Sequence, residues 1–339
     1  MSGALPPFSS LPLRKGDPPY TAWGLYGNDD ERGAFNRLTP ELVLQAKEEI
    51  QTGRTFSLNN PLDFMAKTSV VGRKAFEMNQ YAKLPRVVCD CIWTMNSQCS
   101  TQWDGLRHWA YQSTGQFYGG RTLEDFFNED KSIKSHVNGI QNWEETGIVG
   151  RGVLLDFDRW RRKQNIEFSA TPLNPHKITV DQLKAVAENQ GTEIKFGDIL
   201  FVRTGFTKEY AALSDDDKKK MSTMWQSSGL VQSEQALEWI WSNFSAVAAD
   251  HITFEYWPSV QDWYFHDVLI AGWGMSIGEL FNLDAAAEYC AGINRWSFFV
   301  SSEASLTLCL PITESSLIIV QVCNVPGAVA SPANLLAIF

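Results

Sequence analysis

The feature that most restricts the fold of this chain is an alternation of buried strands and capped helices between residues 151 and 250. Three short apolar runs, at residues 151–157, 197–206 and 246–250, are bounded by charged residues or glycine. Such runs are typical of strands that are buried on both faces of a sheet. Because strands and helices alternate and more strands follow, we expect a single mixed α/β (α+β) domain.

Helix-end signals lie between these strands. Thr179 and Gln182 have the spacing of a capping box, and Gly191 follows the predicted end of their helix. Ser233 is placed to cap a second helix that runs to residue 244. An earlier helix is predicted by an N-cap residue, a proline at the first helical position and a closing glycine: Thr39, Pro40 and Gly53.

The two ends of the chain have different character. Residues 1–20 are rich in Pro, Ser and Gly, which predicts an extended arm lying on the body or on a partner subunit. Residues 297–312 and 316–325 are apolar and are predicted to form C-terminal strands. Since no repeat or interdomain linker is visible, residues 21–339 are predicted to form one catalytic domain.

Composition and charge argue against several classes of function. The net charge is −10, and without a Lys/Arg cluster the chain is a poor candidate for binding nucleic acid or an anionic membrane. The longest basic run, residues 218–220, follows three aspartates and is predicted to be a solvated helix face. Scattered cysteines, a start without a signal peptide and the lack of an apolar run of about 18 residues predict a cytoplasmic protein.

Five histidines are the natural candidates for acid–base chemistry and metal binding. His136 and His176 lie in polar, loop-like stretches, whereas His108, His251 and His266 lie beside carboxylates in aromatic surroundings. Several tryptophans lie near these three: Trp93, Trp103, Trp109, Trp257, Trp263 and Trp273. No GxSxG, GxGxxG or GxxxxGK[ST] motif is present, so neither a serine-hydrolase elbow nor a nucleotide cofactor is indicated.

The densest polar segment surrounds His108. Gln98, Gln102, Asp104 and His108 follow one another at spacings of four, two and four, which can converge if a strand changes into a loop midway. Asp104 and His108 offer a carboxylate and an imidazole, both normal ligands of divalent cations. The alternative is a buried polar network in which Asp104 orients His108 and Arg107 neutralises the charge.

Two other segments contain candidate site residues. His266 and Glu279 lie thirteen residues apart in an apolar, glycine-containing segment. A carboxylate there is either exposed, or buried with a cation or a hydrogen-bond partner. Asp250, His251 and Glu255 are predicted to follow a strand end, where α/β sheets often present functional groups; a surface turn is the alternative.

The chain resembles the cyclase/kynurenine formamidase-like family of metal-dependent hydrolases, which includes isatin hydrolase and trans-dienelactone hydrolase, and it looks most similar to fungal members. The motif of that family is HxGTHxDxPxH, and residues 98–108, QCSTQWDGLRH, align with it without gaps. Three positions match: Thr101, Asp104 and His108. Four depart: Gln98, Ser100, Gln102 and Leu106. The resemblance extends from about residue 20 to 325 and includes GRGVLLD, GDILFVRTG and HDVLIAGWGMSIGELFNL.

The resemblance implies a swivelling β/β/α fold with a mixed sheet, a homodimer or tetramer, a small-molecule substrate and a divalent metal (Mn, Zn or Mg). Together with the residue patterns it gives three sets of candidates. The metal candidates are Gln102, Asp104, His108, His266 and Glu279. The catalytic candidates are Asp104, His108, His251 and His266. The substrate-binding candidates are Trp23, Gln98, Trp103, Arg107, Glu255 and Trp257.

Gln98 and Gln102 stand where the family pattern has histidines. An amide oxygen is a weaker zinc ligand than imidazole, so these residues favour a harder cation, or a site without metal. Two functions follow. The first is metal-dependent hydrolysis of a small cyclic or acyl amide or lactone. The alternative is a cyclase, isomerase or lyase of secondary metabolism that acts on a hydrophobic substrate by acid–base catalysis. A binding protein on a decayed enzyme scaffold is a third interpretation.

Overall fold

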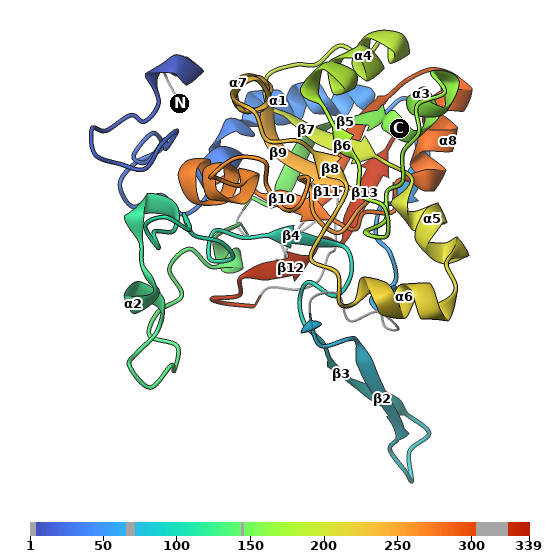
Figure 1. The fold of residues 1–339 in the computed structure, drawn as a ribbon. Helices are drawn as coiled ribbons and strands as arrows, with labels where there is room; N and C mark the ends of the chain where they lie inside the picture. The colour runs from blue at the N-terminus through green and yellow to red at the C-terminus, as the bar shows by residue number, and fades with distance from the viewer. Residues whose placement is uncertain (1–4, 66–71, 144–145, 303–324) are drawn as a thin grey trace.

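A mixed nine-stranded sheet forms the centre of the computed structural model, which describes residues 5–65, 72–143, 146–302 and 325–339 (Figure 1). Its strands are β1 (Thr55–Ser57), β4 (Gln102–Asp104), β5 (Ile148–Asp156), β7 (Asp198–Arg203), β9 (Phe244–Ala249), β10 (Ile277–Glu279), β11 (Ser297–Ser302), β12 (Ala330–Pro332) and β13 (Leu335–Ile338). Their order is β1-β13-β11-β5-β7-β9-β10-β4-β12. β5, β7, β9 and β10 are parallel, and antiparallel strands flank them on both sides. The predicted mixed sheet is therefore confirmed.

Helices cover the sheet (Figure 1). The α-helices are α1 (Pro40–Ala46), α2 (Leu123–Phe126), α3 (Phe157–Lys163), α4 (Val180–Gln190), α5 (Phe206–Ala212), α6 (Asp215–Met221), α7 (Glu234–Asn243) and α8 (Asp284–Ile293). The 3-10 turns are η1 (Phe8–Ser10), η2 (Gly33–Arg37), η3 (Lys47–Glu49), η5 (Tyr118–Gly120) and η6 (Ile140–Trp143), and η7 (Asp267–Gly272) is a π-helix. No helix in the described ranges has the length and apolar character needed to cross a membrane.

The predicted central strands correspond to β5, β7 and β9, and alternate residues face opposite sides of the sheet. Val153, Leu200 and Val247 belong to one buried cluster together with residues of α4 and α7. Phe201 and Ala248 belong to a second cluster, which includes residues of α8. Both faces are therefore buried, which explains why these strands are continuous apolar runs.

Most helix-end signals are confirmed. Thr179 and Gln182 form the capping box of α4, Gly191 closes that helix in the left-handed conformation, and the Ser233 side chain caps α7. The exception is the helix expected to close at Gly53, because α1 ends at Ala46 and is followed by the turn η3. Backbone N–H groups of Thr52 and Gly53 donate to the Phe339 carbonyl instead, so the chain leaves the helix to enter the edge strand β1.

The two predicted ends of the chain are described only in part. The structure describes the arm from residue 5 onward. Two tryptophans of the body bind it: the indole N–H of Trp241 donates to the Pro6 carbonyl, and that of Trp273 donates to the Tyr20 carbonyl. The first predicted C-terminal strand corresponds to β11 up to Ser302. Residues 303–324, which hold the rest of that prediction and nearly all of the second strand, lie outside the described residues.

Two smaller pairs of strands complete the fold. β6 (Lys177–Ile178) and β8 (Gly229–Leu230) pair in parallel. β2 (Glu77–Ala82) and β3 (Cys89–Thr94) form an antiparallel hairpin that stands away from the body (Figure 1). All strand residues of this hairpin are exposed except Asp90, which is half-buried.

Strands β4 and β10 position the candidate site. Their antiparallel register places Gln102 opposite Glu279 and Asp104 opposite Ile277. Because side chains alternate along a strand, Gln102 and Asp104 share one face of β4 and Trp103 lies on the other. Gly278 permits the close approach of the Trp103 indole: a Cβ atom there would lie 2.7 Å from the ring.

Asp250 links strand β9 to helix α5. Its carboxylate, 1% exposed, accepts hydrogen bonds from the backbone N–H groups of Thr204, Gly205 and Phe206 and from the Thr204 hydroxyl. A buried carboxylate with four donors is a structural anchor, because its removal leaves those donors unsatisfied.

We predict that Asp250→Ala lowers the free energy of unfolding by about 3 kcal/mol, because buried donors lose their acceptor. The matched control, Asp216→Ala, changes an exposed aspartate of α6 and should shift stability by less than about 0.5 kcal/mol. Urea unfolding followed by circular dichroism measures both. Equal, small changes in the two variants would contradict the anchoring role.

Candidate functional site

The centre of the site is the carboxylate of Asp104, which is fully buried. Oδ1 accepts a 2.5 Å hydrogen bond from the side-chain amide of Gln98. Oδ2 is buried without a hydrogen-bond partner, and it lies 3.8 Å from Nε2 of His108 and 3.8 Å from Nε2 of His266. Two ring nitrogens therefore face one carboxylate oxygen at distances too long for hydrogen bonds.

Glu255 orients His266. Its Oε1 lies 2.5 Å from Nδ1 of His266 and also accepts the backbone N–H of that residue. Its Oε2 accepts the Phe265 backbone N–H and the Gln232 amide. Because Nδ1 is engaged by a carboxylate, Nε2 is directed towards Asp104 and Glu279, an arrangement common behind metal-ligating histidines.

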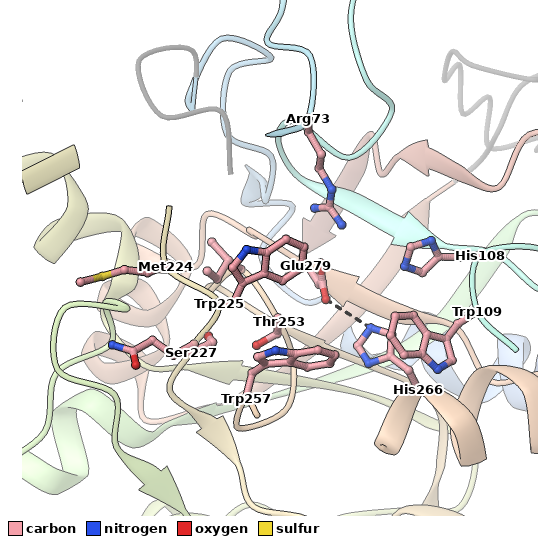
Figure 2. A pocket seen from close by; sticks show the side chains of 12 residues that line it. Arg73, His108, Trp109, Met224, Trp225, Ser227, Thr253, Trp257, His266 and Glu279 are labelled. Carbon is pink, nitrogen blue, oxygen red and sulfur yellow. Dashed lines mark ion pairs between the residues drawn. The ribbon is translucent and has the colours of Figure 1, made fainter. Parts of the chain in front are cut away.

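Glu279 contributes a second buried carboxylate. Its Oε2 accepts a 2.8 Å hydrogen bond from the Gln102 amide, directly across the β4–β10 pair. Its Oε1 lies 3.6 Å from Nε2 of His266 (Figure 2). The other polar atom of Gln102, Oε1, is buried without a hydrogen-bond partner. The site thus contains two unsatisfied oxygen atoms, one each from Gln102 and Asp104.

The two histidines have opposite electrostatic environments. Burial lowers the pKa of His108 to about 4, because the attraction of Asp104 does not compensate for lost solvation. Burial also opposes protonation of His266, but the hydrogen bond with Glu255 and the charges of Glu255 and Glu279 outweigh it and raise its pKa to about 10. Burial and the neighbouring Asp104 raise the pKa of Glu279.

A pocket of about 260 Å³ opens onto this centre. Its lining residues are Arg73, His108, Trp109, Met224, Trp225, Gln226, Ser227, Ile252, Thr253, Trp257, His266 and Glu279. Figure 2 shows His108, Trp109 and His266 grouped at one end, with Met224 and Ser227 at the other. The pocket therefore has a polar, titratable end and a largely apolar wall, as small-molecule sites commonly do.

The structure brings most of the predicted site residues together. The ones around the centre are Gln98, Gln102, Asp104, His108, Glu255, His266 and Glu279. Trp257 lines the pocket. β4 ends at Asp104, and the chain turns before His108, so the converging spacing comes from a strand followed by a turn, as expected.

Four predicted residues lie elsewhere. The Trp23 indole donates to the Ala271 carbonyl, and the Trp103 indole donates to the Ser302 hydroxyl on the other face of β4. Both rings are packed in the core. The remaining two residues, Arg107 and His251, are not among the residues that line the pocket.

Arg107 donates to the Ser135 carbonyl, and its guanidinium lies over the Phe126 ring, 4.3 Å from the centroid. His251 is 1% exposed, and burial lowers its pKa to about 3. Neither side chain lines the pocket, although Ile252 and Thr253, next to His251, do. Asp250, His251 and Glu255 are all buried, so the surface-turn alternative is wrong.

Sequence reasoning missed Arg73 and Trp225 entirely and listed Trp109 only as one of several tryptophans. Trp109 packs against His266 with 5.2 Å between ring centroids, and its indole donates to Asp267. Its position next to His108 could have identified it. Arg73 and Trp225 enter the pocket from segments that lack a motif, so only the fold reveals them.

The donor set fits a divalent cation. One atom from each of Asp104, His108 and His266 lies within 4.8 Å of the others. The unpartnered Oδ2 of Asp104 is the orphaned atom that a cation would satisfy, since buried oxygens are rarely left without a partner. One carboxylate and two imidazoles are normal ligands of zinc, manganese and related ions.

Comparison with known proteins identifies the family of this chain. The model of the family described as "Putative cyclase" matches residues 36–256, well over half of the chain. The chain belongs to this cyclase family. Its members are cyclase- and hydrolase-type enzymes, so the family resemblance inferred from the motif is confirmed. The search of curated proteins found no match.

Solved structures share the fold of this chain. A crystal structure titled a novel cyclase is 28% identical, with a TM-score of 0.78 over 94% of this chain and 99% of the other. Isatin hydrolase A of Labrenzia aggregata, bound to benzyl benzoate, is 15% identical, with a TM-score of 0.52 over 84% of this chain and 93% of that one. Isatin hydrolase A of Ralstonia solanacearum is 15% identical, with a TM-score of 0.51 over 88% and 97%. The last two show a shared fold.

We predict that Glu255→Gln lowers the pKa of His266 in the metal-free protein by more than about one pH unit, because the main charge on Nδ1 is lost. Ring ¹⁵N chemical shifts measure this. At pH 9.5 His266 should be mostly imidazolium in the wild type and mostly neutral in the variant. Signals of His136, which lies outside this network, should stay unchanged.

The contact between Glu255 and His266 also predicts that the stability of the fold depends on pH. The folded-state pKa of His266, about 10, lies above its ordinary value of 6.5. The group therefore stabilises the metal-free fold fully below about pH 6.5, and this contribution is lost as the pH rises through 10. Thermal melts of wild type and Glu255→Gln across this range should converge at high pH; a constant difference would contradict the link.

Proposed function

We propose that this protein is a metal-dependent hydrolase of a small cyclic or acyl amide or lactone with a flat apolar part. The observation that carries the proposal is the buried Oδ2 of Asp104, which faces Nε2 of both His108 and His266 and has no hydrogen-bond partner. Membership of an enzyme family favours catalysis over the binding-protein interpretation.

Asp104, His108 and His266 are the residues that would hold the cation, with Glu279 and the Gln102 amide oxygen adjacent. When bound, a divalent ion lowers the pKa of a water molecule and polarises a carbonyl group. The side-chain amides of Gln98 and Gln102 donate to carboxylates and keep them in place.

The remaining residues handle the proton and the substrate. Hydrolysis adds hydroxide to the carbonyl carbon and a proton to the departing nitrogen or oxygen. The raised pKa of Glu279 suits it to take up and return that proton at Oε1, beside Nε2 of His266. Trp109 and Trp257, whose rings meet at 90°, would hold the flat part of the substrate.

The first test is metal content. We expect about one divalent ion per chain in the purified protein and less than about a tenth of that in Asp104→Asn, which removes the anionic ligand. Asp216→Asn, an exposed matched control, should keep the ion. Elemental analysis measures binding, and turnover of a panel of cyclic amides and lactones, isatin among them, measures activity. Full activity in metal-free protein would overturn the proposal.

The second test addresses the glutamines. Gln98→His should tighten zinc binding about tenfold or more relative to manganese, because imidazole is the stronger zinc ligand. The Gln98 amide nitrogen lies 2.5 Å from Oδ1 of Asp104 and 3.3 Å from both ring nitrogens of His108, so a new ring would enter the centre. Gln226→His, at a lining residue whose side-chain amide donates to the Pro172 carbonyl, is the control and should leave the zinc preference unchanged. Competition titrations compare the three proteins.

A second candidate is a cyclase, isomerase or lyase that acts without metal on a hydrophobic substrate. The opposite pKa shifts of His108 and His266 favour it, because a neutral imidazole and an imidazolium facing one pocket form a base and acid pair. Their ring centroids lie 6.1 Å apart. Mass spectrometry separates the candidates: hydrolysis adds the mass of water to the substrate, whereas isomerisation leaves its mass unchanged.

A further inference from the structure

Trp225 is the exposed member of the aromatic rings that line the pocket. It is 68% exposed, although it lines the same pocket as Trp109 and Trp257, which are half-buried. Apart from Trp93 on the hairpin, all other tryptophans of the chain are buried or half-buried. No aromatic ring of the described residues packs against Trp225. Most of the Trp225 indole is therefore open to water at the pocket.

Trp257 is held on more than one side. It stacks on Tyr264, with ring centroids 4.5 Å apart and planes 23° from parallel, and it meets Trp109 edge-on at 6.0 Å. Because a ring that packs against other rings keeps its orientation, Trp257 offers the pocket a fixed aromatic surface.

The backbone holds the segment of Trp225 beside that of Trp257. The N–H groups of Ser227 and Trp257 each donate to the carbonyl of the other residue, both at 3.0 Å. The side-chain amide of Gln226 donates to the Pro172 carbonyl at 2.6 Å. The exposed indole of Trp225 therefore belongs to a segment that is bound to the body at both of the residues that follow it.

The two indoles bound the space of the pocket without touching each other. In Figure 2 the Trp225 indole lies above that of Trp257, and His108 and His266 lie to the right of both. The pocket that these four residues line has a volume of about 260 Å³. A flat ring that entered between the indoles would have an aromatic surface on each face, with the histidines beyond its end.

Stacking discriminates between flat and puckered rings. Aromatic pairs attract each other by more than the area that they bury. A saturated ring of the same size is puckered, so fewer of its atoms reach the optimal distance from an indole plane. Single exposed apolar side chains are common on protein surfaces, but Trp225 lines a pocket beside a titratable centre, where a ligand can cover it.

We infer that Trp225 covers the outer face of the bound substrate, so that the substrate carries a flat unsaturated ring held between Trp225 and Trp257. The inference rests on the proposed hydrolase for the bond that is broken, but the recognition of the ring is independent of it. Trp225 is thus a specificity-determining residue that selects flat rings over saturated ones.

Calorimetric titration with naphthalene-2-carboxamide and its saturated analogue, decahydronaphthalene-2-carboxamide, tests recognition without turnover. The wild type should bind the flat amide at least about fivefold more tightly. Trp225→Ala should weaken binding of the flat amide about tenfold and that of the saturated amide less than about threefold. Trp225→Phe, which keeps a flat ring, should retain most of the preference. Trp93→Ala, at the other exposed tryptophan, is the control and should behave as the wild type.

The indole ¹⁵N–¹H signal of Trp225 reports contact directly in the wild-type protein. Its loss from the spectrum of Trp225→Phe identifies it. The signal should shift when the flat amide is added, because the ring current of a stacked ligand acts on the indole, and should shift less with the saturated amide. An unshifted signal, a wild type that does not prefer the flat amide, or equal losses of both amides in Trp225→Ala would overturn the inference.

Turnover separates this inference from the proposed function. For phthalide and its saturated analogue hexahydrophthalide, Trp225→Ala should raise the KM of phthalide about tenfold and that of the saturated lactone less than about threefold, with kcat nearly unchanged. If both lactones are cleaved with unaltered KM in Trp225→Ala, the inference fails and the hydrolase proposal stands. If no lactone or amide is cleaved but binding of the flat amide depends on Trp225, the hydrolase proposal fails and the inference stands.

Discussion

The burial of the Asp104 carboxylate is the constraint around which the rest of the site is arranged. Taking an ionisable group out of water costs several kcal/mol unless partners replace the lost solvation. Gln98 supplies one such partner, and His108 and His266 approach the other oxygen without bonding to it. Glu255 in turn holds His266 in this orientation. The network is complete on one side of the carboxylate and incomplete on the other, and the incomplete side is where a cation fits.

Because of the two glutamines, this site has a different ratio of carboxylates to strong metal ligands from that of the histidine-rich motif of the family. Gln98 and Gln102 each donate to one acid, Asp104 and Glu279. An amide donor holds a carboxylate in place without adding charge, whereas a histidine at the same position could ligate the ion. The acids of the site are therefore kept while strong ligands are fewer, so the ion of the proposed hydrolase would be a harder and more weakly held one.

Features that depend on residues close together in the sequence were predictable, whereas features that depend on distant residues were not. The caps of α4 and α7 depend on residues three positions apart, so they could be read directly. Gly53 does not close α1 but bonds to Phe339, far along the chain, so the end of that helix was mispredicted. In the site, the segment around His108 was identified because its members are close in sequence. Trp103 was misplaced because alternation along β4 turns it to the opposite face, and Arg73 arrives from a segment without a motif. The oligomeric state stays a prediction.

The pairing of β4 with β10 also determines at what stage of protein synthesis the site can form. Gln102 and Glu279 are 177 positions apart. At a synthesis rate of about 5–20 residues per second, on the order of ten seconds separates their emergence from the ribosome. During that interval Asp104 and His108 lack both the second histidine and the strand that positions Glu279. The buried network around Asp104 can therefore form only after β10 has been synthesised and has paired with β4.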